Sequence, residues 1–338
     1  MKGYIYNTIL TALTALALSA CNGRATTGTT SVTPTTDTLV AAPTFNADSA
    51  MSYLRRQCDF GPRVPGTAAH RACGEWISRA FAATGARTAD HNTTVRGYDG
   101  KEMPCRNIMA FANPDAGPRI LITAHWDSRA WADNDPDADN HRTPVPAAND
   151  GASGIAVMLE LARLIANMPP AIGVDFVCFD AEDQGHPQWD DSYDDEADEA
   201  GFWCLGSRAW AEEAFSRGYT ARFAINLDMV GGRGARFAVE GYSQRSAPSV
   251  AQLVWAKAAL LGHDDIFTNT TGGYVMDDHV SVIQLANIPA IDIIPNVDDP
   301  RSSFGRTWHT LSDTPDAIDP DILAAVGQTL LQVIYSMK

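Results

Sequence analysis

Acidic and histidine residues recur along this chain close to apolar segments. In chain order they are His125 with Asp127, Asp150, Glu182 with Asp183, Asp228, Asp277 with Asp278 and His279, and His309. Carboxylate and imidazole groups are both ligands of Zn²⁺, and a catalytic zinc keeps three protein ligands and one open position. These residue types therefore predict a metal-dependent enzyme.

Strand-like apolar segments must position these residues. Residues 120–124 run into His125, residues 174–179 precede Glu182, and residues 221–227 precede Asp228. The carboxyl ends of strands in an open α/β sheet meet at one crevice, so residues far apart in sequence can share one site. Helical periodicity appears between the strands, at 152–167, 205–215, 249–261 and 321–336. We therefore expect an α/β fold with a single core.

The turn sequence Pro-Asp-Ala-Gly-Pro at residues 114–118 separates two strand-like segments. Segments 107–112 and 120–124 on either side of it are predicted to be adjacent strands. A further strand is expected over 289–295.

The start of the chain is typical of an export signal. Lys2 precedes an apolar run over residues 9–20, which ends in Leu-Ser-Ala-Cys with Cys21 last. This ending resembles a bacterial lipobox, in which the cysteine becomes the acylated first residue; an ordinary cleaved signal is the alternative. We expect a periplasmic lipoprotein whose only membrane attachment is a lipid anchor at Cys21.

Composition divides the chain into three predicted parts. These are a lipoprotein signal peptide over 1–20, a flexible tether rich in Thr, Ala and Pro over 21–48, and a catalytic zinc-dependent domain over 49–338. The net charge of −16 argues against nucleic acid as a partner, because phosphates would be repelled. The cysteines besides Cys21 are five, an odd number, so at least one of them stays free.

Several segments have a purely structural interpretation beside the functional one. Asp150 precedes a predicted helix and could simply cap it. Residues 60–67, rich in Gly and Pro, are predicted to form a rigid turn rather than a substrate site. The acidic residues of 190–199 are predicted to form a solvated loop, because their spacing fits no defined calcium loop.

The motifs around these residues resemble those of zinc aminopeptidases that carry a pair of metal ions and of their relatives, the animal-type glutaminyl cyclases. The motifs span roughly residues 50–338 and are His-Trp-Asp-Ser at 125–128, Ala-Asn-Asp-Gly-Ala-Ser-Gly at 148–154, Phe-Asp-Ala-Glu-Asp at 179–183, Gly-Ser at 206–207, Asn-Leu-Asp at 226–228, Asp-His at 278–279, Ile-Pro-Ala at 288–290 and Trp-His-Thr at 308–310. The doubled acid Asp277-Asp278 and Trp308 before His309 resemble the cyclases, as does the segment 125–136. The resemblance implies a single domain with a central mixed, twisted β-sheet and helices on both faces.

The resemblance also implies a role for each site residue. One Zn²⁺ per chain would be bound by Asp150, Asp183 and His309, although cyclases commonly have Glu at the position of Asp183. Glu182 would transfer protons, and Asp228 and Asp277 would share a proton in a relay beside it. Trp308 would bind the substrate. From its place in the insertion, Trp189 is a further candidate for substrate binding, with a hydrophobic contact outside the site as the alternative.

The expected activity is conversion of N-terminal glutaminyl residues of peptides or exported proteins to pyroglutamate, with release of ammonia. A two-metal zinc aminopeptidase is the main alternative, with His125 and Asp228 completing its second metal site. A catalytically inactive binding lipoprotein is the third possibility, and the complete set of candidate ligands argues against it.

Overall fold

The strands that precede the candidate site residues lie side by side in one six-stranded sheet. The computed structural model describes residues 38–190 and 201–338. Its main sheet has the order β1-β2-β4-β3-β5-β8. The strands are β1 (Arg87–Arg96), β2 (Glu102–Ala112), β3 (Arg119–His125), β4 (Gly173–Phe179), β5 (Ala224–Leu227) and β8 (Ala290–Ile293). The last four in the order are parallel, and β1 and β2 are antiparallel, so the sheet is mixed as predicted.

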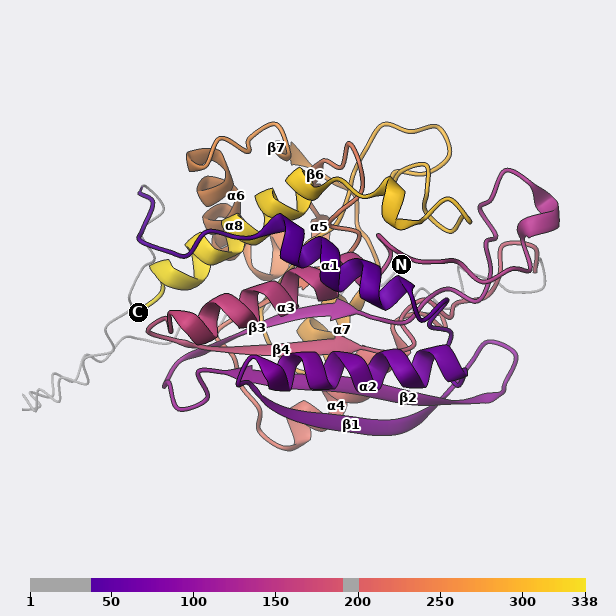
Figure 1. Cartoon of the computed structure of the whole chain (residues 1–338), viewed down its shortest axis with the longest axis horizontal. Coiled ribbons are helices and arrows are strands. Elements are labelled where there is room, and N and C mark those ends of the chain that lie inside the picture. The colour runs from indigo at the N-terminus through magenta and orange to yellow at the C-terminus, as the bar shows by residue number, and fades with distance from the viewer. Residues whose placement is uncertain (1–37, 191–200) are drawn as a thin grey trace, which may run out of the picture. The chain divides into compact units, whose positions relative to one another are not determined.

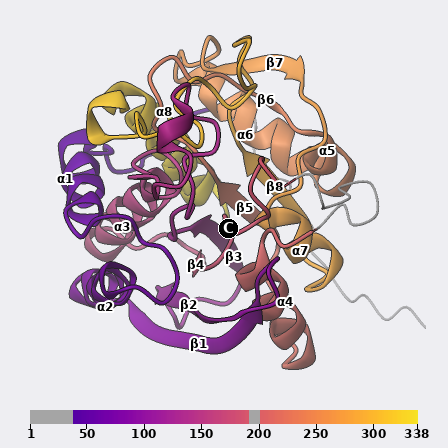
Figure 2. The ribbon, with the colours of Figure 1, turned by 90° about the vertical axis from the view of Figure 1, so that its right-hand side faces the viewer.

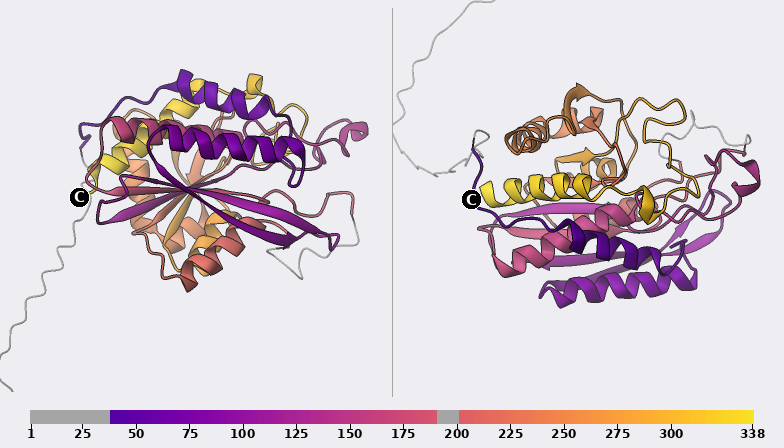
Figure 3. Two further views of the ribbon diagram at one scale, coloured as in Figure 1. Left: turned by 60° about the horizontal axis from the view of Figure 1, so that its bottom comes forward. Right: turned by 45° about the horizontal axis from the view of Figure 1, so that its top comes forward.

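Helices cover both faces of this sheet, as Figure 3 shows in its left panel. On one face lie α1 (Ala47–Cys58), α2 (Ala68–Ala83), α3 (Ala152–Asn167) and α8 (Pro320–Ser336). The other face packs against α4 (Leu205–Ser216) and α7 (Asp278–Gln284). Every residue of β4 is buried. A strand covered on both faces is mostly apolar, and the one charged residue of β4, Asp175, is paired with Arg119.

The remaining elements lie beyond β8 and in the loops. They are β6 (Phe237–Val239), α5 (Gly241–Ser246), α6 (Pro248–Leu260), β7 (Phe267–Thr271) and the short 3₁₀ helices η1 (Ala138–Asn140) and η2 (Pro315–Ala317). β6 and β7 pair with each other in a second, two-stranded sheet. Figure 1 shows the elements along the chain, and Figure 2 shows β4, β3, β5 and β8 in the middle of the domain with helices around them.

The lateral order of the strands differs from the prediction at one place. β2 and β3 are consecutive in sequence, but β4 lies between them, paired antiparallel to β2 and parallel to β3. The prediction that these two strands are adjacent was therefore wrong. β4 is the more fully buried strand, and insertion between two neighbours satisfies its backbone groups on both edges.

The folded domain begins earlier than predicted. Val40 exchanges two hydrogen bonds with the side chain of Gln332 in α8, at 2.8 and 3.0 Å. Phe45 is buried against the backbone of α8 at Gly327. Residues 38–48, assigned to the flexible tether, are therefore part of the domain, and the described residues form one compact unit. The signal peptide and the rest of the tether lie outside the described residues, as do residues 191–200 of the acidic loop.

The segment 60–67 forms a turn that supports a neighbouring loop. Arg63 within it is fully buried and donates to the backbone oxygens of Pro146 and Ala147 at 2.7 and 2.6 Å. It thereby fixes the loop that leads to Asp150. In the described part of the chain, no helix is long and apolar enough to cross a membrane.

Candidate active site

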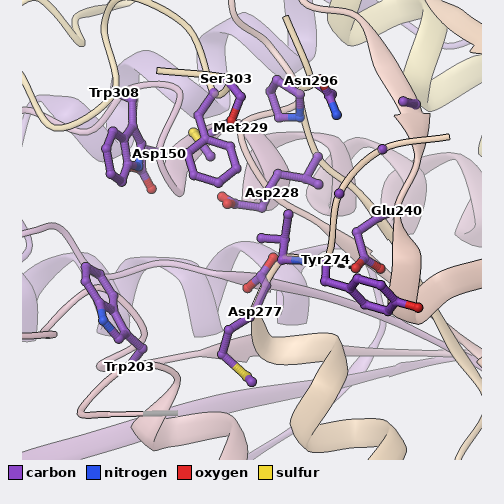
Figure 4. Close-up of a pocket in the computed structure, with 18 of the residues that line it drawn as sticks. Asp150, Trp203, Asp228, Met229, Glu240, Tyr274, Asp277, Asn296, Ser303 and Trp308 are labelled. Carbon is purple, nitrogen blue, oxygen red and sulfur yellow. Dashed lines mark hydrogen bonds between the residues drawn. The ribbon is translucent and has the colours of Figure 1, made fainter. Parts of the chain in front are cut away.

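A cavity of about 400 Å³ opens at the carboxyl ends of the parallel strands. Figure 4 shows acidic residues on its floor and aromatic residues on its walls. Its lining includes all but one of the predicted catalytic, metal-binding and substrate-binding residues: Asp150, Glu182, Asp183, Asp228, Asp277, Trp308 and His309. The strand ends thus bring together residues separated by more than 150 positions in the sequence.

Asp150, Asp183 and His309 converge on one point. Their ligand atoms all lie within 4.8 Å of one another. His309 Nε2 is 3.1 Å from Asp183 Oδ1 and 3.7 Å from Asp150 Oδ2. Asp183 Oδ2 is buried without a hydrogen-bond partner, a costly arrangement for a carboxylate oxygen unless a cation or donor satisfies it. Two carboxylates and one imidazole fit the donor set of a catalytic zinc.

Asp150 is not a helix cap. α3 begins at Ala152 after Gly151, and no side chain caps it. The Asp150 carboxylate instead contacts His125 Nε2 at 3.0 Å. A Cβ atom at position 151 would lie 2.4 Å from the backbone oxygen of His125, so only glycine lets this loop approach β3 so closely.

A second three-residue group shares Asp150 with the first. His125 Nε2 lies 3.2 Å from Asp228 Oδ1 as well as 3.0 Å from Asp150. Hydrogen bonds to these carboxylates and to Asp127 outweigh burial and raise the pKa of His125 well above its ordinary value. A protonated His125 would neutralise these acids in the absence of a second metal ion. His125, Asp150 and Asp228 also satisfy the distance requirement for a metal site.

Two buried aspartates hold the loops that carry these residues. Asp313 accepts the backbone amides of residues 149 and 150 at 2.8 and 3.1 Å. Asp127 accepts the amides of residues 182 and 183 at 3.1 and 3.3 Å. Asp127 therefore fixes the turn after β4, which carries both Glu182 and the ligand candidate Asp183.

Glu182 follows β4 at a tight turn in which Ala181 has a φ of 52°. Its Oε1 accepts a hydrogen bond from the thiol of Cys204 at 3.3 Å. Burial raises the pKa of Glu182 well above its ordinary value, and the charges of Asp183 and Asp277 add to the effect against the opposing influence of His125. A carboxyl group of this kind can both take and return a proton near neutral pH.

Asp277 lies beside Glu182, and their carboxylate oxygens are within 4.8 Å of each other. Asp277 Oδ2 accepts a hydrogen bond from Asn226 at 2.8 Å. The buried carboxyl of Asp292 also bonds to Asp277, and burial together with the charge of Asp277 raises the pKa of Asp292 well above its usual value. Asp277 therefore has a proton-sharing partner in Asp292, which the sequence did not predict.

Asp228 faces the same part of the cavity as Asp277. Burial raises the pKa of Asp228 to about 7; the charge of Asp277 adds to this increase, and the hydrogen bond from His125 opposes it. Asp228 and Asp277 repel each other through their charges, and no hydrogen bond joins these two described residues. This differs from the prediction that Asp228 and Asp277 share a proton. Among the described residues, the carboxyl that hydrogen-bonds with Asp277 is that of Asp292.

Aromatic rings form the wall above His309. Trp308 stacks on the His309 ring with centroids 3.8 Å apart, and Trp203 is parallel to the same ring at 6.0 Å. Trp189, predicted to bind substrate, does not line this cavity. It packs instead against Trp131 and His141, at centroid distances of 6.2 and 6.4 Å. Trp203, at the far end of the same insertion, lines the cavity wall where Trp189 was expected.

The remaining predicted residues lie beneath the cavity. Asp278 is fully buried at the start of α7. His279 bridges Glu240, at 3.1 Å, and Asp292, at 3.6 Å. Sequence reasoning missed Trp203, Cys204, Asp292 and Asp313 as parts of the site. Asp292 interrupts an apolar strand-like segment, and that is a signal that could have identified it.

The chain resembles several known proteins over most of its length. Residues 107–334 match the model of peptidase family M28. A glutaminyl cyclase from Bacteroides thetaiotaomicron, solved with N-acetylhistamine bound, is 46% identical with a TM-score of 0.84, over 88% of this chain and 100% of that chain. A Zn-dependent exopeptidase from Parabacteroides distasonis is 44% identical with a TM-score of 0.83, over 87% of this chain and 99% of that chain.

A curated relative is more distant. The protein YfbL of Escherichia coli, described as uncharacterized, is 29% identical over 291 residues, which are 78% of this chain and 79% of that relative. Similar overall folds therefore occur in proteins described as cyclases and as exopeptidases. The choice between these activities depends on the arrangement of residues within the site.

Proposed function

The chain belongs to peptidase family M28, and we propose that it is a glutaminyl-peptide cyclotransferase, which converts N-terminal glutaminyl residues of peptides to pyroglutamate. The observation that carries the proposal is the position of Asp277, within 4.8 Å of the proton-transfer residue Glu182 and in the same cavity as Asp150, Asp183 and His309. The similarity to glutaminyl cyclases over their entire length supports it.

Asp150, Asp183 and His309 would hold one zinc ion per chain. The buried oxygen of Asp183 that lacks a hydrogen-bond partner supports this assignment. When bound there, zinc supplies Lewis-acid polarisation of the substrate's side-chain amide carbonyl.

Glu182 would move the proton that the reaction requires. The α-amino nitrogen of the substrate forms a bond to the side-chain amide carbon, and the bond from that carbon to the amide nitrogen breaks. Glu182 takes a proton from the attacking amine and gives it to the departing nitrogen, which leaves as ammonia. Its buried position and raised pKa suit both halves of this transfer.

Asp277 would orient the substrate's amine and the leaving nitrogen beside Glu182. It can accept an N–H from either group, because its own carboxylate is fixed by Asn226 and Asp292. Asp228 on the same side would complete the acidic wall.

The aromatic wall would select the folded-back conformer of the substrate. Trp308 and Trp203 flank His309, and Phe304 packs on Trp308 with centroids 5.2 Å apart. Nucleophile and electrophile belong to one molecule, so holding them close and in line supplies much of the rate enhancement.

A two-metal aminopeptidase is the second candidate. The group of His125, Asp150 and Asp228 favours it, because these residues meet closely enough to hold a second ion. In that enzyme Glu182 would activate water, and free amino acids would be released.

One experiment separates the two activities. The purified protein is incubated with a peptide that begins with Gln, and the masses of the products are measured by mass spectrometry. A cyclase yields the intact peptide lighter by one ammonia, whereas an aminopeptidase releases free Gln; release of Gln without ammonia loss would overturn our proposal. Metal analysis adds an independent measurement, with about one zinc per chain expected for the cyclase.

Cys21 would anchor the protein to a membrane on the periplasmic side. The apolar run of residues 9–20 and the Leu-Ser-Ala-Cys sequence that ends it support this proposal. Mass spectrometry of the N-terminal peptide from cells would test it: an acylated Cys21 is expected, and an unmodified terminus at another residue would contradict it.

A further inference from the structure

Residues 133–135 lie against the segment that carries the metal ligand His309. The amide of Asn134 donates to the backbone oxygen of His309 at 3.0 Å, and the Asn134 side chain donates to the Trp308 oxygen at 3.1 Å. Asp135 Oδ2 accepts the amide of Leu311 at 2.9 Å. Two consecutive residues of one loop, Asn134 and Asp135, thus bind the backbone at and on both sides of His309.

The side chain of Asp133 reaches the His309 ring itself. Asp133 Oδ1 lies 3.4 Å from His309 Nδ1, and both groups are almost completely buried. His309 Nδ1 is buried and makes no regular hydrogen bond among the described residues, and Asp133 Oδ1 is the carboxylate oxygen that faces it. The opposite nitrogen, Nε2, points to Asp183 and Asp150. A proton on Nδ1 that faces Asp133 would leave Nε2 free as the metal-binding nitrogen.

Arg129 connects Asp133 to a second metal ligand. Its guanidinium binds both oxygens of Asp133, at 2.8 and 2.5 Å, and lies 3.5 Å from Asp183 Oδ1. It also donates to the backbone oxygens of Asp183 and His186 at 3.3 and 3.1 Å. The guanidinium is fully buried beneath the Trp203 ring, 4.6 Å from its centroid.

His309 needs such support because its backbone is strained. Its φ is 53°, in the left-handed region that residues other than glycine rarely adopt. A residue keeps this conformation only where its surroundings determine it strongly. The backbone contacts of Asn134 and the side-chain contact of Asp133 act on the same residue from the same loop.

We propose that Asp133 is a positioning residue for the metal site, which fixes the tautomer and orientation of the His309 ring while Arg129 couples it to Asp183. The inference rests on the proposed zinc site but goes beyond the proposed reaction, since it holds for either a cyclase or a peptidase. Removal of a carboxylate that accepts the second N–H of a ligating histidine commonly weakens metal binding by about 10–100-fold. We therefore expect a loss of zinc affinity of about that size when the Asp133 carboxylate is removed.

The test is the zinc affinity of the full protein, measured by competition with a chelator of known affinity. Asp133→Asn is expected to weaken zinc binding by about 10–100-fold. The matched control is Asp175→Asn. Asp175 is equally buried and pairs with Arg119 at 2.9 and 3.0 Å, but it lies in β4 away from the cavity. This control should lower the melting temperature and leave zinc affinity unchanged.

An unchanged zinc affinity in Asp133→Asn would overturn the inference, as would an equal loss of affinity in Asp175→Asn. Asp133→Asn leaves the buried Arg129 with one charged partner fewer, and this could prevent folding. In that case zinc affinity is measured on the double variant Arg129→Met with Asp133→Asn, which removes both charges. Zinc affinity equal to wild type in that variant would likewise overturn it. A wild-type protein that bound no zinc would refute the metal assignment instead. A wild-type protein that bound zinc but released free Gln would refute only the cyclase reaction.

Discussion

Glu182 lines the cavity with its side chain 12% exposed, and its carboxylate has the Cys204 thiol as its hydrogen-bond donor among the described residues. Burial raises the pKa of Glu182 well above its ordinary value, and the charges of its acidic neighbours Asp183 and Asp277 add to this effect. This environment distinguishes it from Asp183, the next residue, whose carboxylate lies 3.1 Å from His309 Nε2. Two adjacent acids thus have different roles because a turn directs them to different neighbours.

Replacement of the Glu182 carboxylate should abolish proton transfer without emptying the metal site. Glu182→Gln is expected to lower kcat by about 10²–10⁴-fold, the usual contribution of a general acid or base. Zinc content should remain at the wild-type level, because Gln at 182 removes no proposed ligand. Steady-state kinetics and metal analysis check both parts, and substantial remaining activity would show that the proton-transfer assignment is wrong.

Cys204 should matter through the orientation of Glu182. Cys204→Ala removes the thiol donor and is expected to lower kcat by about 2–10-fold with little change in KM, since a neutral hydrogen bond contributes about 0.5–1.5 kcal/mol. Cys204→Ser keeps a donor and should retain most of the activity. Cys73→Ala, at a fully buried thiol in α2, is the control and should leave kcat unchanged. An Ala variant as active as wild type would exclude this role.

At the scale of elements, Glu240 links two short helices beneath the cavity. It is the N-cap of α5, accepting the amides of Tyr242 and Ser243 at 2.8 Å each, and it contacts His279 of α7 at 3.1 Å. Burial alone would raise its pKa, but the hydrogen bond from His279 and those from the two amides lower the pKa of Glu240 to about 2.

This depressed pKa gives a stability contribution with a defined pH window. The folded state favours the charged Glu240, so its contribution is complete above the unfolded-state pKa near 4.5 and is lost as pH falls toward 2. Glu240→Gln should therefore lower the free energy of unfolding at pH 7 by about 1.5–3 kcal/mol, the range for hydrogen bonds to a charged group.

Urea unfolding of both proteins between pH 7 and pH 3 measures this difference. The difference between the two proteins should be constant above about pH 5 and shrink below it, while the loss of zinc at low pH affects both proteins alike. A difference that stayed constant down to pH 3 would contradict the assignment of a depressed pKa to Glu240.

At the scale of the whole molecule, residues 38–48 fasten the start of the domain to its last helix. Phe45 lies flat on α8, where a Cβ atom at Gly327 would come within 2.2 Å of its ring. Gln328 adds hydrogen bonds with the amide of Phe45 and the oxygen of Pro43, at 2.9 and 3.1 Å. This contact joins positions almost 300 residues apart.

Loss of the Phe45 ring should destabilise the domain. Phe45→Ala is expected to lower the free energy of unfolding by about 3 kcal/mol, because it removes a buried aromatic side chain and leaves a cavity over α8. Leu39→Ala is the control: Leu39 is 46% exposed and should change stability by less than about 0.5 kcal/mol. Chemical denaturation measures both, and a neutral Phe45→Ala would show that residues 38–48 are dispensable to the fold.

The sequence by itself determined the elements and most of the candidate site. The helix predicted over 152–167 has the same bounds in the structure, and those predicted at 205, 249 and 321 begin within one residue of the observed helices, because an amphipathic period is a local property of the chain. The strand ends likewise placed Asp150, Glu182, Asp183 and His309 at one cavity, since all carboxyl ends of parallel strands meet there.

Only the tertiary structure decided how distant segments meet. It inserted β4 between β2 and β3, placed Trp203 rather than Trp189 on the cavity wall, and brought Asp133 to the ring of His309. Strand order and contacts between loops depend on pairings across long stretches of chain, and local composition does not encode those pairings. The partner of a buried carboxylate, such as Asp292 for Asp277, depends on sub-ångström differences in packing, so its identity appears only once the chain is folded.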